Sequence, residues 1–192
     1  MKLTTTLNEI KEHSPCDYGW NILCEHLGKN FDHDEDINLL TILESNGIQD
    51  CLWAFRTTHQ DSKPVAVKIA IEFARRVLHI FDDKYPDDER PRKAIESAEA
   101  WVNDPTEENR IVADSASKAA AAAYDAYAAA NAAYAAANAA YAVANATYAA
   151  ANAANAAANA GYVAAYAAAN AAAYDRDAEL IAQAEIIRKH LI

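Results

Sequence analysis

The residues best suited to chemistry surround a charged turn near the middle of the chain. They are Arg75, Arg76, Tyr85, Asp87, Asp88, Arg90 and Arg92. Arginine binds a carboxylate through two parallel hydrogen bonds, so these side chains are suited to a network of ion pairs. The pattern predicts either a structural clasp between two helices or an arginine-lined pocket for a small anionic ligand or an acidic partner loop.

No enzyme motif accompanies this turn. The six histidines lack metal-ligand spacing, and the sequence contains no glycine-rich phosphate loop, no CxxC pair and no nucleophile beside a recognisable base. Residues 33–36, with the sequence HDED, have the composition of a cation site, but a solvated helix N-terminus is the simpler interpretation. We therefore expect a non-enzymatic protein without a metal or cofactor.

The chain is acidic, and its acidity is unevenly distributed. The net charge is −11 at pH 7. Residues 1–104 hold 12 basic and 20 acidic side chains, whereas residues 105–192 hold 5 and 8. Nucleic-acid binding requires a basic footprint, so no direct contact with nucleic acid is expected. A solvated acidic surface, a basic partner and mimicry of nucleic acid all fit this charge.

The cysteines and the start of the chain indicate a reducing compartment. Cys16, Cys24 and Cys51 form no disulfide framework, and the first residues carry no apolar signal-peptide run. We expect a cytoplasmic protein in which these thiols are small buried side chains. The alanine-rich stretch has the length of a membrane span, but its recurring asparagines and weakly apolar alanines argue against one.

Residues 119–173 are almost entirely alanine, interrupted at regular intervals by tyrosine and asparagine. Alanine is the strongest helix former, so this stretch is predicted to be α-helical. Two series with a period of seven share one stripe of the helix: Tyr127, Asn131, Tyr134, Asn138, Tyr141, Asn145, Tyr148 and Asn152. We interpret the stripe as a helix-packing seam, with a ligand-binding stripe as the alternative.

A single helix over residues 105–192 would be about 130 Å long, which a compact monomer of this size does not accommodate. We therefore expect the alanine-rich region to fold back on itself or to form a homo-oligomer. The best candidates for the break are residues 159–161, which contain the only glycine of the region, and residues 152–155, where the tyrosine series lapses.

The rest of the chain predicts amphipathic helices and no strand. The expected helices cover residues 4–12, 15–28, 33–46, 48–55, 64–81, 91–102 and 174–192. Ser14 and Asp104 are the expected N-caps, each followed by proline at a first-turn position. Trp20, Trp53 and Trp101 are expected core anchors. The last helix is expected to bury Leu180, Ile181, Ala184, Ile187 and Leu191.

The predicted fold is all-α. A compact bundle of short helices in residues 1–104 continues into long alanine-rich helices in residues 105–192, which end in an amphipathic C-terminal helix. We expect the two parts to form one structural unit.

Two stretches carry a family resemblance. Residues 71–110 read IEFARRVLHIFDDKYPDDERPRKAIESAEAWVNDPTEENR, and residues 14–56 contain SPCDYGWNILCEHLG and LLTILESNGIQDCLWAFR. With the alanine-rich tail, they resemble bacterial and phage proteins of the Imm-5-like immunity group of polymorphic-toxin systems. Residues 85–101 are the most specific part. The resemblance implies a protein that binds and neutralises a partner, and it assigns no catalytic residue.

Three functions follow as hypotheses. The first is a non-enzymatic immunity or anti-defence protein that blocks a toxin or a host defence protein. The second is a sponge for a nucleotide-type immune signal, held by the arginines and stacked on tyrosine rings. The third is an oligomerising helical scaffold built on the Tyr/Asn stripe.

Overall fold

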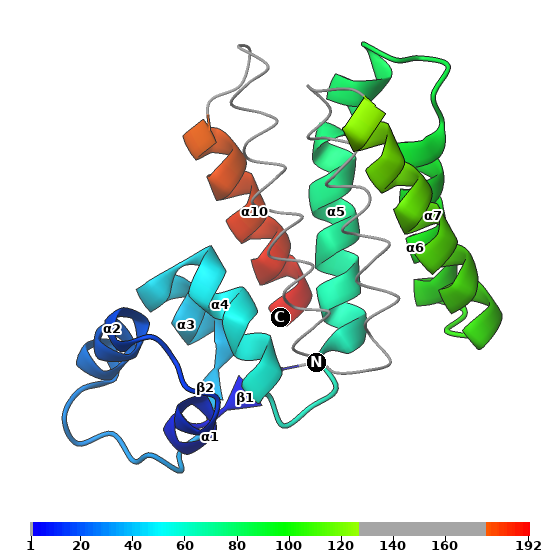
Figure 1. Ribbon diagram of the computed structural model, residues 1–192. Helices are drawn as coiled ribbons and strands as arrows, with labels where there is room; N and C mark the ends of the chain where they lie inside the picture. Colours follow the sequence, from blue (N-terminus) through cyan, green and yellow to red (C-terminus); the bar gives the residue numbers. More distant parts are fainter. Residues whose placement is uncertain (1, 127–175) are drawn as a thin grey trace.

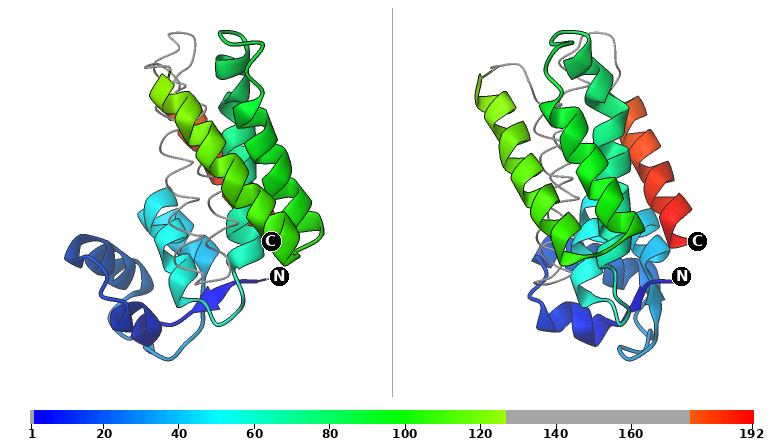
Figure 2. Two further views of the ribbon diagram at one scale, coloured as in Figure 1. Left: turned by 45° about the vertical axis from the view of Figure 1, so that its right-hand side comes forward. Right: turned by 90° about the vertical axis from the view of Figure 1, so that its right-hand side faces the viewer.

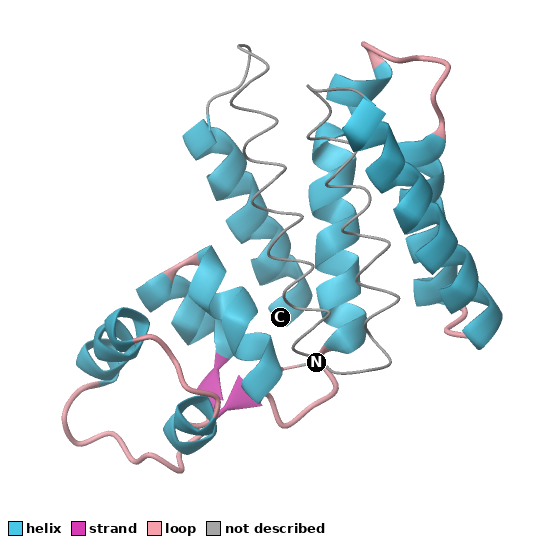
Figure 3. Ribbon diagram, in the orientation of Figure 1, coloured by secondary structure: helices cyan, strands magenta, loops and turns pink. Residues whose placement is uncertain are grey.

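The computed structural model describes residues 2–126 and 176–192, and it confirms the all-α fold (Figures 1 and 3). The elements are β1 (Thr4–Thr5), α1 (Leu7–Glu12), α2 (Asp17–Leu27), β2 (Ile37–Asn38), α3 (Leu39–Asn46), α4 (Ile48–Ala54), η1 (Phe55–Thr57), α5 (Lys63–Asp82), α6 (Arg90–Asn103), α7 (Glu107–Ala126) and α10 (Arg176–Leu191). The Tyr/Asn stripe and both expected breaks lie outside the described residues. No helix in the described ranges combines the length and apolarity needed to cross a bilayer.

Helix α5 lies between α6 and α10, and α7 packs on α6 (Figure 1). Helix α10 also contacts α3 and α4, so it joins the N-terminal helices to the bundle around α5. The views in Figure 2 show that the two ends of the chain lie close to each other. The last helix of the chain therefore packs against helices from both the N-terminal part and the bundle around α5.

One continuous core connects both ends of the chain. It runs from Leu3 to Leu191 and includes Ala113 and Ala120 of α7. Helix α5 contributes buried residues on several sides, because it is covered by other helices on more than one face. Its proline in the first turn and its apolar stripe were both visible in the sequence. The expected division near residue 104 stays a prediction.

Two short strands replace part of the expected helical structure near the N-terminus. Thr4 pairs with Asn38 and Thr5 with Ile37 in an antiparallel ladder. Helix α1 therefore begins only at Leu7, after a capping box between Thr6 and Glu9. Strands of two residues are too short to show the alternation that identifies a strand in a sequence.

The acidic helix start predicted at residues 33–36 is wrong, because these residues form a loop before β2. Helix α3 starts instead at Leu39, where the Asn38 side chain accepts a hydrogen bond from Leu40 N at 2.9 Å. The predicted cap at Ser14 is also wrong. Ser14 has a positive φ of 54°, and Cys16 caps α2.

The predicted cap of α7 is displaced by two residues. Asp104 ends α6 with an extended backbone, and Thr106 Oγ1 accepts the hydrogen bond from Asn109 N at 3.3 Å. Asn109 Nδ2 donates back to Asp104 O at 2.8 Å. Asp and Thr are both good N-caps, so the sequence did not distinguish which of the two residues flanking Pro105 has this role.

Helix α10 buries a more polar face than the sequence predicted. Its buried residues, spaced by four, are Glu179, Gln183, Ile187 and Leu191. Leu180 and Ala184 are only half-buried, and Ile181 is 65 % exposed, contrary to the expected apolar stripe. The physical reason is an ion pair that no local pattern reveals.

This ion pair joins α10 to α5. Arg76 Nη2 lies 2.9 Å from Glu179 Oε2, and Arg76 Nε lies 3.1 Å from both carboxylate oxygens. Gln183 Nε2 donates to Glu179 Oε1 at 3.2 Å. Because a buried carboxylate requires a charged or hydrogen-bonded partner, the pair turns this side of α10 toward α5.

Replacing Arg76 with alanine should lower the free energy of unfolding by about 3 kcal/mol, because it leaves a buried carboxylate without its cation. The Glu179 side chain is 1 % exposed and that of Arg76 36 %. The matched control is Arg75→Ala, whose 54 % exposed side chain pairs with Glu99. That variant should lose at most about 1 kcal/mol. Equal losses in urea unfolding would contradict the assigned role of Glu179.

A second set of ion pairs between α5 and α10 predicts that the stability of the protein falls at low pH. Lys189 Nζ and His190 Nε2 lie 2.8 and 2.7 Å from Glu72 Oε1. Partial burial raises the pKa of Glu72, but the hydrogen bonds and charges of Lys189 and His190 outweigh it, so the pKa is lowered overall. The resulting stabilisation is complete above about pH 5 and is lost as the pH falls through the lowered pKa.

The variant Glu72→Gln should therefore have a lower free energy of unfolding than the wild type at neutral pH. The difference between the two proteins should shrink as the pH falls from about 5 to about 3. Urea unfolding at a series of pH values measures this difference. A constant gap across the series would show that the charge of Glu72 does not contribute.

Candidate functional site

The structure distributes the predicted site residues among separate ion pairs. Arg90 Nη2 lies 2.6 Å from Asp88 Oδ2, within the turn, and the Arg90 side-chain hydrogen bond lowers the pKa of Asp88. Arg92 Nη2 lies 2.5 Å from Asp82 Oδ2 and so ties α6 to the end of α5. This geometry is that of a clasp between two consecutive helices.

The other predicted residues lie elsewhere on the same helices. Arg75 and Arg76 leave α5 in two directions, one toward α6 and one toward α10. The ring of Tyr85 packs 5.1 Å from that of Phe81, and Asp87 is exposed. Across the described residues, these seven side chains are not brought together in one pocket.

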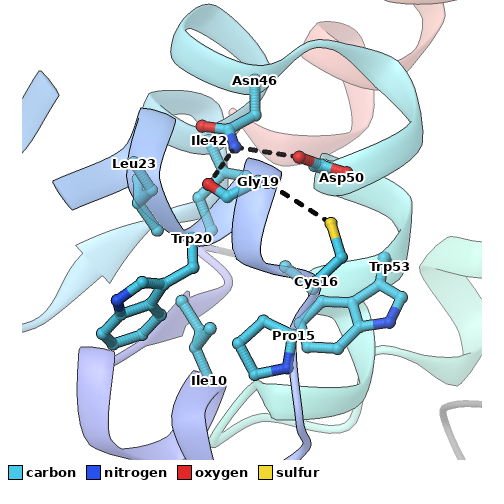
Figure 4. A pocket seen from close by; sticks show the side chains of 11 residues that line it. Ile10, Pro15, Cys16, Gly19, Trp20, Leu23, Ile42, Asn46, Asp50 and Trp53 are labelled. Carbon is cyan, nitrogen blue, oxygen red and sulfur yellow. Dashed lines mark hydrogen bonds between the residues drawn. The ribbon is translucent and has the colours of Figure 1, made fainter. Parts of the chain in front are cut away.

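A small apolar pocket lies instead among the first four helices, where the sequence predicted no site (Figure 4). Its volume is about 120 Å³. The apolar wall comes from Ile10 of α1, Pro15 before α2, Leu23 of α2, Ile42 of α3 and Ala54 of α4. We call it the α1–α4 pocket.

Two tryptophans border the pocket. Trp20 of α2 and Trp53 of α4 are half-buried and lie at its edge, whereas Trp101 is buried in the core. The prediction that all three are core anchors is confirmed for Trp101, whereas Trp20 and Trp53 pack against the core only from its edge. Nothing in the spacing of residues 20 and 53 relates them, because their approach depends on how α2 packs on α3 and α4.

Gly19 brings α2 close to the other wall of the pocket. Asn46 Nδ2 donates to Gly19 O at 2.8 Å and to Asp50 Oδ2 at 2.9 Å, while Gly19 N donates to Cys16 Sγ at 3.3 Å (Figure 4). A Cβ atom added to Gly19 would lie 2.5 Å from Asp50 Oδ2. The close approach of α2 to Asp50 therefore requires glycine.

Asp50 supplies the pocket with a carboxylate that accepts a hydrogen bond. In the described part of the chain, its partner is the amide of Asn46, and no arginine, lysine or histidine forms a salt bridge with it. The surrounding segment is strongly acidic, since residues 2–54 carry 10 acidic and 3 basic side chains, whereas residues 55–104 carry 10 and 9. Most of the acid excess of the first 104 residues thus belongs to residues 2–54, which include the four helices around the pocket and the acidic loop at residues 32–36.

The three cysteines differ in their surroundings. Cys16 is exposed at the pocket edge, which contradicts the expectation that all three thiols are buried, and Cys24 is half-buried. Cys51 is fully buried, and burial, together with the negative charge of Asp50, raises its pKa. Cys16 is therefore the thiol that reagents should reach first.

Residues 33–36 hold the loop before β2 through side-chain contacts to α1 and His59. Asp34 Oδ1 accepts a hydrogen bond from Asn8 at 2.7 Å. His59 links Asp36 to α1: its Nε2 lies 3.4 Å from Asp36 Oδ1 and its Nδ1 lies 2.8 Å from Glu9 Oε1. Among the described residues, no group of three His, Cys, Asp or Glu side chains is arranged to hold a metal ion.

The comparisons with known proteins identify a family. A model described as "Family of unknown function (DUF6931)" matches residues 62–188, which is more than half of the chain. The chain belongs to this family. No curated protein and no solved structure matches it. The matched segment begins immediately before α5, so the α1–α4 pocket lies outside it.

The close approach at Gly19 predicts a stability change. Gly19→Ala should lower the free energy of unfolding by about 1–3 kcal/mol, because the new methyl group displaces a carboxylate that Asn46 holds. In an Asp50→Ala background, the same change should be neutral or slightly stabilising, since alanine favours the helix. Urea unfolding of the four proteins measures the coupling, and identical effects in both backgrounds would contradict the assigned contact.

Proposed function

We propose that this protein is a non-enzymatic immunity or anti-defence protein, which binds and neutralises a toxin or a host defence protein. The α1–α4 pocket is its recognition site. The partner inserts one side chain into the pocket and covers the acidic surface around it. The resemblance of residues 14–56 and 71–110 to immunity proteins supports the same class of function.

The size of the pocket carries the proposal. Sites for nucleotides and other cofactor-sized molecules usually have volumes of about 300–1,000 Å³, whereas a cavity of about 150 Å³ holds one benzene ring. At about 120 Å³, the α1–α4 pocket has room for one side chain. In protein interfaces, a few anchor side chains in such pockets account for most of the binding energy.

The surroundings of the pocket fit a protein partner. Tyr18, the neighbour of Gly19 in the chain, is 78 % exposed. Exposed aromatic residues are enriched in protein interfaces, where they bury a large area with little loss of conformational entropy. The net negative charge of residues 2–54 favours a partner with a basic face, which it would also attract over a distance.

The two other hypotheses receive less support. A nucleotide sponge requires cationic groups available to the ligand, but Arg75, Arg76, Arg90 and Arg92 each pair with a carboxylate. An oligomerising scaffold depends on the Tyr/Asn stripe, which lies outside the described residues.

A bulky side chain at the pocket edge should abolish neutralisation. The test compares Cys16→Trp, which places an indole at the mouth of the pocket, with Cys16→Ser, which keeps a side chain able to cap α2. Native mass spectrometry of the protein purified from its own host identifies the bound partner. The partner gene is then expressed alone and with each variant. We expect growth arrest that the wild type and Cys16→Ser relieve and Cys16→Trp does not.

Circular dichroism of both variants verifies that they fold. A mass that corresponds to a bound nucleotide or only to copies of this chain would contradict the proposal. So would a partner that causes no growth arrest, or equal rescue by Cys16→Trp and Cys16→Ser.

A further inference from the structure

We propose that the side chain received by the α1–α4 pocket is a lysine or arginine of the partner. Its methylene stem would lie along the apolar wall, and its cationic head would meet the carboxylate of Asp50. This inference rests on the proposed function, because it specifies the chemistry of the anchor that the same pocket takes.

The lining has the two parts that such a side chain needs. Ile10, Pro15 and Leu23 provide an apolar surface. Lysine and arginine bury their stems along surfaces of this kind while their heads remain at polar groups. Trp20 and Trp53 also line the pocket. The faces of their rings attract cations, so they favour the cationic head of the partner's side chain.

Asp50 decides the charge of the guest. Its carboxylate lines the pocket and accepts one hydrogen bond, from Asn46, yet no salt bridge to it exists within the described ranges. An apolar guest would bring this carboxylate out of water without compensation, at a free-energy cost that a cationic guest avoids. An anionic guest would add repulsion.

The molecule already uses one of these rings to bind a cation. The guanidinium carbon of Arg56 lies 4.8 Å from the centre of the Trp53 ring, and Arg56 Nε donates to Trp53 O at 2.9 Å. Arg56 is not part of the pocket lining. The surrounding excess of acidic residues acts in the same direction as Asp50, since it attracts a cationic anchor and repels an anionic one.

Small probes of matched length test the inference on the full-length protein. The probes are n-butylammonium and n-butylguanidinium as cations, n-butanol as the neutral control and pentanoate as the anionic control. The indole N–H signals in nitrogen–proton correlation spectra report binding. Those of Trp20 and Trp53 should shift saturably with the cations, while that of the buried Trp101 should remain in place.

We expect the cations to bind about five- to tenfold more tightly than butanol, and pentanoate not to bind. Asp50→Asn, which keeps the acceptor for Asn46, should reduce this preference to about twofold or less. Equal binding of butanol and butylammonium, preference for pentanoate, or no shift at Trp20 and Trp53 with any probe would each overturn the inference.

These outcomes are separable from those of the proposed function. If neutralisation depends on the pocket but the probes show no preference for cations, the proposed function stands and the anchor is not cationic. If the cations select the pocket but Cys16→Trp still neutralises the partner, the pocket binds cations without being the recognition site, and the proposed function fails.

Discussion

The ion pair between Arg76 and Glu179 fixes how the C-terminal helix α10 packs on α5. Glu179 is almost completely buried, and its carboxylate is satisfied by Arg76 of α5 and by Gln183 one turn along its own helix. Sliding α10 by one turn would separate the buried charge from its partner. Another register would therefore leave a buried charge unpaired, at a cost in free energy.

Helix α10 in turn provides the surface on which the N-terminal helices α3 and α4 pack. Helix α10 contacts α5 on one side and α3 and α4 on the other, and Leu191 joins the core that begins at Leu3. The pocket lies among these N-terminal helices. Its shape depends on the close approach of Gly19 in α2 to Asp50 in α4. Hydrogen bonds from Asn46 hold both sides of that contact, so the positions of α2 and α4 beside the pocket are fixed relative to each other.

The segment that matches the family and the residues that line the pocket lie in different parts of the chain. Residues 62–188 include α5, α6 and α7 and most of α10, and this segment contains the ion pairs that tie those helices together. The pocket and most of the excess negative charge lie before it. In the proposed function, the bundle around α5 is therefore a scaffold, and the recognition surface is formed by the helices that precede it.

The sequence by itself determined the elements whose signals are local. The apolar stripe and first-turn proline of α5 and the ends of α2 and α3 follow from period and propensity, and the all-α fold follows from such local signals. Charge also identified residues 1–104 as the acidic part.

Only the tertiary structure decided which charged groups pair and where a pocket forms. Arg76 and Glu179 are separated by 103 positions, and the pocket requires Trp20, Asp50 and Trp53 from two helices that approach each other through a glycine. Helical periodicity places a side chain on a face, but it does not say which distant face will cover it. The free energy of a carboxylate depends on its burial and its partners, so the roles of Glu179 and Asp50 become distinguishable only once the helices are packed.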